Sequence, residues 1–118
     1  MTYHMYYLLN KDRSVTPCGA DEWTANHRPH KVAHWSMTNG DVEISTVFLG
    51  LNHAFHSGPP LIFETMVFTD VYPEINEDMH RYSTWDQALA GHKEMIDMVE
   101  SYLLLHKSGL IEIEESAT

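Results

Sequence analysis

The residues best suited to chemistry gather just after the middle of the chain. His53 and His56 stand in residues 52–61, a stretch rich in His, Gly and Pro, and Glu64 and Asp70 follow soon after it. Imidazole and carboxylate groups can bind zinc or another divalent metal, or act as general acid and base. His-x-x-His in a loop is a weak metal motif, however. A polar loop that merely turns the chain is therefore the competing interpretation.

Glu64 is a second candidate because its expected strand is otherwise apolar. Alternation along residues 62–69 places it on one face with three apolar side chains, Ile62, Met66 and Phe68. A buried carboxylate must be paired, hydrogen-bonded or protonated, and such groups often mark functional clefts. An edge strand, from which Glu64 could reach water, is the alternative.

His92 and His106 fall on the apolar face of the expected C-terminal helix. A histidine there is more often a satisfied core or rim residue than a ligand. Gly91 favours His92, because a glycine lets another group approach closely. If the helix crosses the sheet, we expect His92 to meet Glu64 or His53. Our candidate ligand-binding residues, none of them assigned a catalytic role, are His53, His56, Glu64 and His92, with His53 and His56 as the ligands of any divalent metal.

Other patterns point to structure more than to chemistry. His27, His30 and His34 straddle a loop and a strand and are typical of solvated surface. The one cysteine, Cys18, excludes an internal disulfide and fits a reducing compartment. The chain has no Gly-rich phosphate loop, no Cys-x-x-Cys pair and no nucleophile elbow. The sequence therefore lacks a common enzyme signature.

Asn39-Gly40 is the strongest local signal for the elements that must position these residues. Asn-Gly between two β-patterned runs, residues 31–38 and 41–51, is typical of a type I′ hairpin, in which both central residues have positive φ. The two-residue turn predicts a register that pairs Met37 with Val42, Trp35 with Ile44 and Ala33 with Thr46. These residues, with Phe48, would form one apolar face.

The remaining elements complete an α+β fold. Apolar residues from Trp85 to His106 recur at steps of three and four, which predicts an amphipathic helix over 85–106. Thr84 and Gln87 make a capping box at its start. Further expected elements are strands over 3–9, 14–17 and 62–69, a short strand ending at 81–82, a short helix over 21–27 and a last edge strand over 110–114. We predict a single domain, residues 1–118, with an antiparallel sheet of four or five strands and the C-terminal helix packed across one face.

Charge and composition limit the functional classes. The formal net charge is −10, so direct binding to nucleic acid is not expected, because it requires a basic footprint. An acidic surface could instead mimic nucleic acid, or merely keep the protein soluble. No signal-peptide pattern and no apolar run of membrane-spanning length occurs. We expect a soluble, cytoplasmic protein that does not bind membranes.

Three blocks of the chain look familiar together: Ser45-Thr-Val-Phe-Leu-Gly-Leu-Asn-His53, Gly58-Pro-Pro-Leu-Ile-Phe-Glu-Thr-Met-Val-Phe68, and Tyr82-Ser-Thr-Trp-Asp-Gln-Ala88 through Gly91-His92. With the opening Tyr-Tyr-Leu-Leu and Val-Thr-Pro-Cys, the chain resembles a family of small uncharacterised proteins of bacteriophages and prophages over residues 3 to about 100. The resemblance implies a phage or mobile-element origin and no particular activity. It would place the protein in the cytoplasm of the host cell. This chain has Asn52 where the family commonly has aspartate, and His56 where it is usually glycine-rich.

These observations favour a non-enzymatic binding protein. It would engage a host protein or sequester a small ligand such as a nucleotide signal, as anti-defence proteins do. A metal-dependent hydrolase using the His and Glu residues of 52–64 is the first alternative, and an acidic nucleic-acid mimic is the second. The apolar residues of 110–113 favour a homo-oligomer, since small domains often complete a pocket across a symmetric interface.

Overall fold

The computed structural model describes residues 3–28 and 30–107 of the 118-residue chain. Eight elements follow one another in the order β1 (Tyr6–Leu9), β2 (Val15–Cys18), α1 (Ala20–Asn26), β3 (His30–Ser36), β4 (Glu43–Phe48), β5 (Phe63–Phe68), β6 (Met79–Tyr82) and α2 (Trp85–Lys107). The strand expected over 110–114, and with it the apolar segment thought to favour oligomers, lies outside the described residues.

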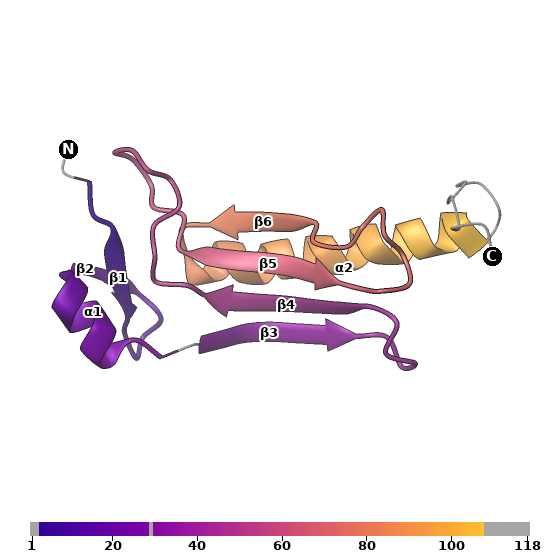
Figure 1. Cartoon of the computed structure of the whole chain (residues 1–118), viewed down its shortest axis with the longest axis horizontal. Coiled ribbons are helices and arrows are strands. Elements are labelled where there is room, and N and C mark those ends of the chain that lie inside the picture. The colour runs from indigo at the N-terminus through magenta and orange to yellow at the C-terminus, as the bar shows by residue number, and fades with distance from the viewer. Residues whose placement is uncertain (1–2, 29, 108–118) are drawn as a thin grey trace.

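The main layer is a four-stranded antiparallel sheet in the order β3-β4-β5-β6, and α2 lies along one of its faces (Figure 1). β1 and β2 form a separate two-stranded sheet at one end of the molecule. The predicted α+β class, with the long C-terminal helix across the sheet, is confirmed. Within the described residues, no helix has both the length and the apolar character needed to span a membrane.

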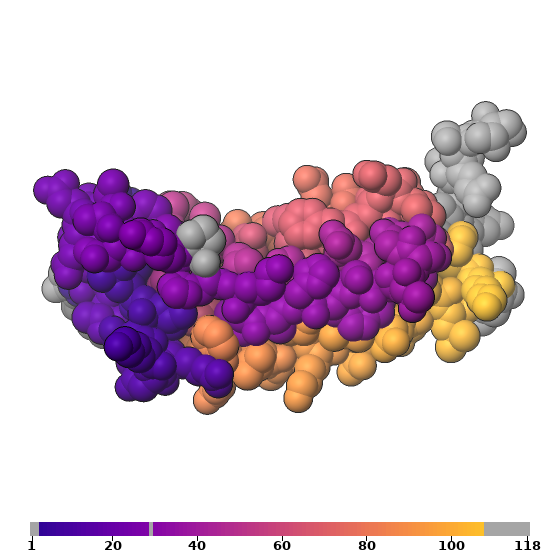
Figure 2. Space-filling view, turned by 90° about the horizontal axis from the view of Figure 1, so that it is seen from below, coloured from indigo at the N-terminus to yellow at the C-terminus, as the bar shows by residue number. Residues whose placement is uncertain are grey.

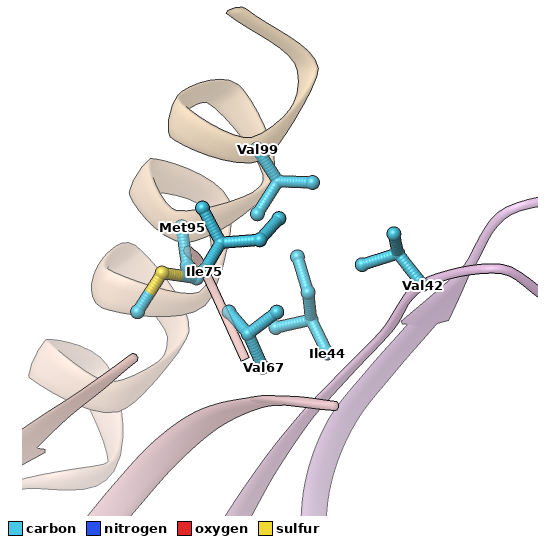
Figure 3. Packing of buried hydrophobic residues seen from close by; sticks show 6 residues of the cluster. All are labelled: Val42, Ile44, Val67, Ile75, Met95 and Val99. Carbon is cyan, nitrogen blue, oxygen red and sulfur yellow. The ribbon is translucent and has the colours of Figure 1, made fainter. Parts of the chain in front are cut away.

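The core forms where the apolar stripe of α2 meets the inner face of the sheet. Six buried residues pack together there: Val42, Ile44, Val67, Ile75, Met95 and Val99 (Figure 3). Met95 and Val99 are one helical turn apart, so both point toward the sheet. The helix begins as expected, because the Gln87 N–H donates to Thr84 Oγ1 at 3.1 Å. The Gln87 side chain accepts from the Ser83 N–H at 3.0 Å, one residue earlier than in the usual capping box.

The β3–β4 hairpin has the predicted register but not the predicted turn. Trp35 pairs with Ile44 and Ala33 with Thr46, and the Met37 N–H donates to Val42 O at 2.9 Å. The Gly40 N–H donates to Met37 O at 2.9 Å, and Gly40 has φ +79 whereas Asn39 is not among the residues with positive φ. The type I′ prediction was therefore wrong. The Asn39 side chain instead accepts from the Asp41 N–H, which holds Asn39 in an Asx-type turn.

β1, β2 and α1, which we call the head, are attached to the end of the sheet through β1. The Tyr7 N–H donates to Gly50 O at 2.8 Å, and Tyr6 forms an isolated bridge with Leu51. The head stands at one end of a molecule about 50 Å long (Figures 1 and 2). Pro17 lies within β2 and does not end it as expected, because β2 is an edge strand in which its missing N–H is not required.

Candidate functional site

The sheet has one face covered by α2 and one face that no described helix or strand covers, which we call the open face (Figure 2, upper side). Strand register places its residues in rows. Val47, Glu64 and Arg81 form one row, and Ser45, Met66 and Met79 form the next. Phe68 and Met79 on this face are 45% and 41% exposed. The open face thus combines exposed apolar side chains with charged ones.

Glu64 and Arg81 form an ion pair across neighbouring strands of the open face. The Arg81 Nε–H donates to Glu64 Oε2 at 3.0 Å, and the Arg81 and Glu64 side chains are 29% and 15% exposed. Glu64 was expected to need a partner, and it has one. Its side chain lies on the open face and not on the covered face that packs into the core. Because both side chains are partly desolvated, the pair is worth more than a fully exposed one, about 1 kcal/mol or somewhat above.

His53 lies at the base of the loop 52–61, close enough to Glu64 and Arg81 for both charges to shift its pKa. Partial burial lowers its pKa, the Arg81 guanidinium lowers it further, and the Glu64 carboxylate raises it. The structure therefore places His53 within electrostatic range of Glu64. The histidine is therefore mainly neutral near pH 7, with one ring nitrogen donating and the other accepting a hydrogen bond.

Asn52 fixes the loop from inside. Its side chain is 2% exposed and uses both ends of the amide. Oδ1 accepts from the N–H groups of Ala54 and Leu61, at 2.9 and 3.1 Å, and Nδ2 donates to His4 O at 2.9 Å. The loop ends are thereby tied together and to the strand leading into the head. An aspartate could not make all three bonds, since a carboxylate cannot donate to His4 O.

Phe55 is the least expected residue of this loop. It adopts φ 58, a left-handed conformation that bulky side chains rarely take, and its ring is 74% exposed. The ring contacts His53 edge-on, with centroids 6.1 Å apart. The ring is therefore an exposed aromatic side chain that the core does not use, held next to His53.

The other two sequence candidates lie elsewhere. His56 is exposed, and its Nδ1 bonds only to the neighbouring Ser57 O at 2.8 Å. His92 is 5% exposed and lies between α2 and the covered face, opposite to the face of Glu64. The expectation that His92 approaches Glu64 is therefore wrong. Glu64 and Thr65 are neighbours in β5 and point to opposite faces, and His92 lies on the face of Thr65.

His92 ends a buried polar chain between helix and sheet. Its Nδ1 lies 2.7 Å from Thr46 Oγ1, which lies 2.6 Å from Thr65 Oγ1. The Thr65 hydroxyl bonds in turn to the phenol of Tyr82. Burial lowers the pKa of His92 and raises that of Tyr82, so both groups stay neutral. Each buried hydroxyl is satisfied, which makes this chain a positioning device for α2.

Sequence reasoning missed Arg81 and Phe55. Arg81 meets Glu64 only because of the β5–β6 register, which the long acidic connection between the strands does not reveal. Phe55 offered a signal, because a lone aromatic residue between polar and Gly/Pro residues is not part of any periodic apolar pattern.

The proximity of His53 to the ion pair predicts opposite effects for the two neutralising substitutions. Arg81→Gln should raise the pKa of His53 because it removes a nearby positive charge, and Glu64→Gln should lower it because it removes a negative one. NMR titration of the His53 ring protons measures both shifts. Lys107→Gln, at the C-terminal end of α2 and thus at the end of the molecule opposite the head (Figure 1), serves as the control, and equal shifts in all three variants would contradict the assignment.

Among residues 3–28 and 30–107, no three His, Cys, Asp or Glu side chains come together in a way that could hold a metal ion. His53, His56, Glu64 and His92 do not form such a set. What the site offers chemically is recognition: an aromatic ring, a neutral imidazole and a paired guanidinium and carboxylate. Comparison of the chain with protein-family models, with curated proteins and with solved structures finds no match in any of the three.

Proposed function

We propose that the protein is a small, non-enzymatic accessory protein of phage type that binds a host protein through Phe55 and the adjoining open face. The exposed, left-handed Phe55 is the observation that carries this proposal. Backbone strain of this kind costs about 1–3 kcal/mol and persists where function requires it. Asn52 holds the loop in that conformation, so the ring is pre-organised before any partner arrives.

The surroundings of Phe55 suit a protein partner. Interfaces are enriched in aromatic residues, Met and Arg, and a few such residues supply most of the binding energy. The open face provides Met66, Met79 and Arg81 beside Glu64. A partner surface with an apolar pocket for Phe55 and a polar rim for the ion pair would match it.

The two alternatives have less support. A metal-dependent hydrolase would need His92 near Glu64, yet the two lie on opposite faces of the sheet. A nucleic-acid mimic has some support from charge, because residues 32–118 carry fourteen Asp and Glu against three Lys and Arg. Its binding to a basic host protein would weaken steeply with salt.

The proposal predicts that Phe55→Ala abolishes capture of the host partner. Truncation of an aromatic hot spot costs about 2–4 kcal/mol, which is at least a thirtyfold loss of affinity by about 1.4 kcal/mol per tenfold. Tagged protein is incubated with bacterial lysate at low and high salt, and retained proteins are identified by mass spectrometry. Met98→Ala, at a 42% exposed position on α2, is the matched control.

A protein retained by the wild type and by Met98→Ala, and lost with Phe55→Ala, is the expected result. Equal retention by both variants would show that Phe55 is not part of the interface. Retention that disappears at high salt in every variant would favour the mimic instead.

A further inference from the structure

A second site lies where the head meets the sheet, away from the Glu64–Arg81 pair. A partly open cavity of about 270 Å³ lies there between β1, α1 and the ends of β3 and β4 nearest the head. Its polar lining includes Asn10, Glu22, Asn26, His27, Arg28 and His30, and Phe48 and two leucines complete it. The volume is just below the usual range of about 300–1,000 Å³ for ligand sites, so a small ligand would fill the cavity and extend through its open side.

Aromatic rings line one part of this cavity. His27 and His30 both stand tilted against Phe48, with centroids 6.2 and 6.3 Å apart. His27 is also stacked on Trp23 at 4.4 Å and 19°, which fixes the plane of the imidazole. The free face of His27 offers a contact to a planar ligand at little cost in side-chain entropy, whereas Phe48, 2% exposed, can contribute only a ring edge.

The orientation of His27 is set by its buried side. Nδ1 is buried and has no hydrogen-bond partner among the described residues, and it packs toward Gly50, where a Cβ atom would lie 3.2 Å away. Burial lowers the pKa of His27, so the ring is neutral near pH 7. Because protonating Nδ1 would bury an unsatisfied N–H, the hydrogen belongs on Nε2, which becomes a donor.

Charge makes this end of the molecule different from the rest. Residues 1–31 carry four Lys and Arg against three Asp and Glu, whereas the remainder is strongly acidic. One Nη of Arg28 donates to His27 O at 2.8 Å, which holds the guanidinium at the cavity and leaves its other N–H groups for a ligand. This end therefore repels an approaching anion less than the strongly acidic remainder of the chain does.

We infer that the cavity binds a small planar anion, specifically a nucleoside monophosphate, with Arg28 and His30 on the phosphate and the base beside His27 and Phe48. The Oδ1 atoms of Asn10 and Asn26 and the carboxylate of Glu22 offer acceptors for base amino groups or ribose hydroxyls. This site is separate from the open face, so the inference does not rest on the proposed host-protein interaction.

Isothermal titration calorimetry of the full chain with AMP, adenosine and inorganic phosphate tests the inference. AMP should bind at least about tenfold more tightly than adenosine or phosphate, because only AMP engages both parts of the cavity. Arg28→Gln should weaken AMP binding about tenfold or more, whereas Lys93→Gln, an equal loss of charge on α2, should change it less than about twofold. NMR should locate the binding through shifts of the Asn10 and Asn26 side-chain amides.

Three results would overturn the inference. Phosphate binding as tightly as AMP would reduce the site to a simple anion site. Equal losses in Arg28→Gln and Lys93→Gln would mean general electrostatic attraction, and absence of AMP binding at millimolar concentration would exclude a nucleotide site. Arg28 is exposed, so circular dichroism should show both variants folded.

Discussion

Replacing Asn52 with aspartate should lower the free energy of unfolding at pH 7 by about 2–3 kcal/mol, although the side chains have the same shape. The amide donates to His4 O and accepts two backbone N–H groups in a site that is 2% exposed. A carboxylate keeps the acceptors but places a negative charge against a carbonyl oxygen. Urea unfolding followed by circular dichroism measures the loss.

The pH dependence of this Asn52→Asp variant has a definite sign. A protonated carboxyl group at position 52 could donate to His4 O as the amide does, so folding favours the neutral acid and raises its pKa above the unfolded value of about 3.9. The penalty is therefore absent below that unfolded value and grows as pH rises toward the folded pKa. Relative to the wild type, the variant should recover stability in acid.

Asn76→Asp is the matched control. Asn76 is exposed, and its Oδ1 accepts from the Thr69 N–H at 3.0 Å, a bond that a carboxylate can keep. We expect a change below about 1 kcal/mol and no acid recovery. Equal losses in the two variants would mean that the donor role of Asn52 is unimportant.

Gly91→Ala should destabilise the protein by about 2–4 kcal/mol, although alanine is the better helix former by about 1 kcal/mol. A Cβ atom at position 91 would overlap the hydroxyl and ring of Tyr82. Either the phenol, which bonds to Thr65, or the helix would have to shift. Thermal or urea unfolding would reveal the loss.

A double-mutant cycle separates this clash from any other effect of alanine. Tyr82→Leu removes the hydroxyl and ring atoms that the new Cβ would meet. In that background Gly91→Ala should cost nothing or stabilise slightly, because only helix propensity remains. A cost that persists without the ring would show that Tyr82 is not the obstacle.

The sequence was informative wherever neighbours along the chain decide the outcome. The register of β3 with β4 and the span of α2 were both predictable, because a short turn and a 3.6-residue period act locally. Even there the turn type was misjudged, since the Asn39 side chain supplies its own hydrogen bond and makes positive φ unnecessary.

Which face of β5 is covered could not be read from the chain. Both sides of that strand are largely apolar, with Phe63 and Val67 on one and Met66 and Phe68 on the other. Only packing against α2 decides that Phe63 and Val67 are buried and that Glu64 lies on the open face. The same packing places Glu64 and His92 on opposite sides of the sheet.

By itself, the sequence determined that residues 52–64 hold chemically capable side chains and that one long helix closes an antiparallel sheet. The tertiary structure alone decided their partners. Arg81 reaches Glu64 through strand pairing, Asn52 reaches His4 across the chain, and the head cavity joins segments far apart in sequence. Such contacts depend on which distant segments of the chain pack together. Periodicity and turn chemistry describe only neighbouring residues and carry no information about that packing.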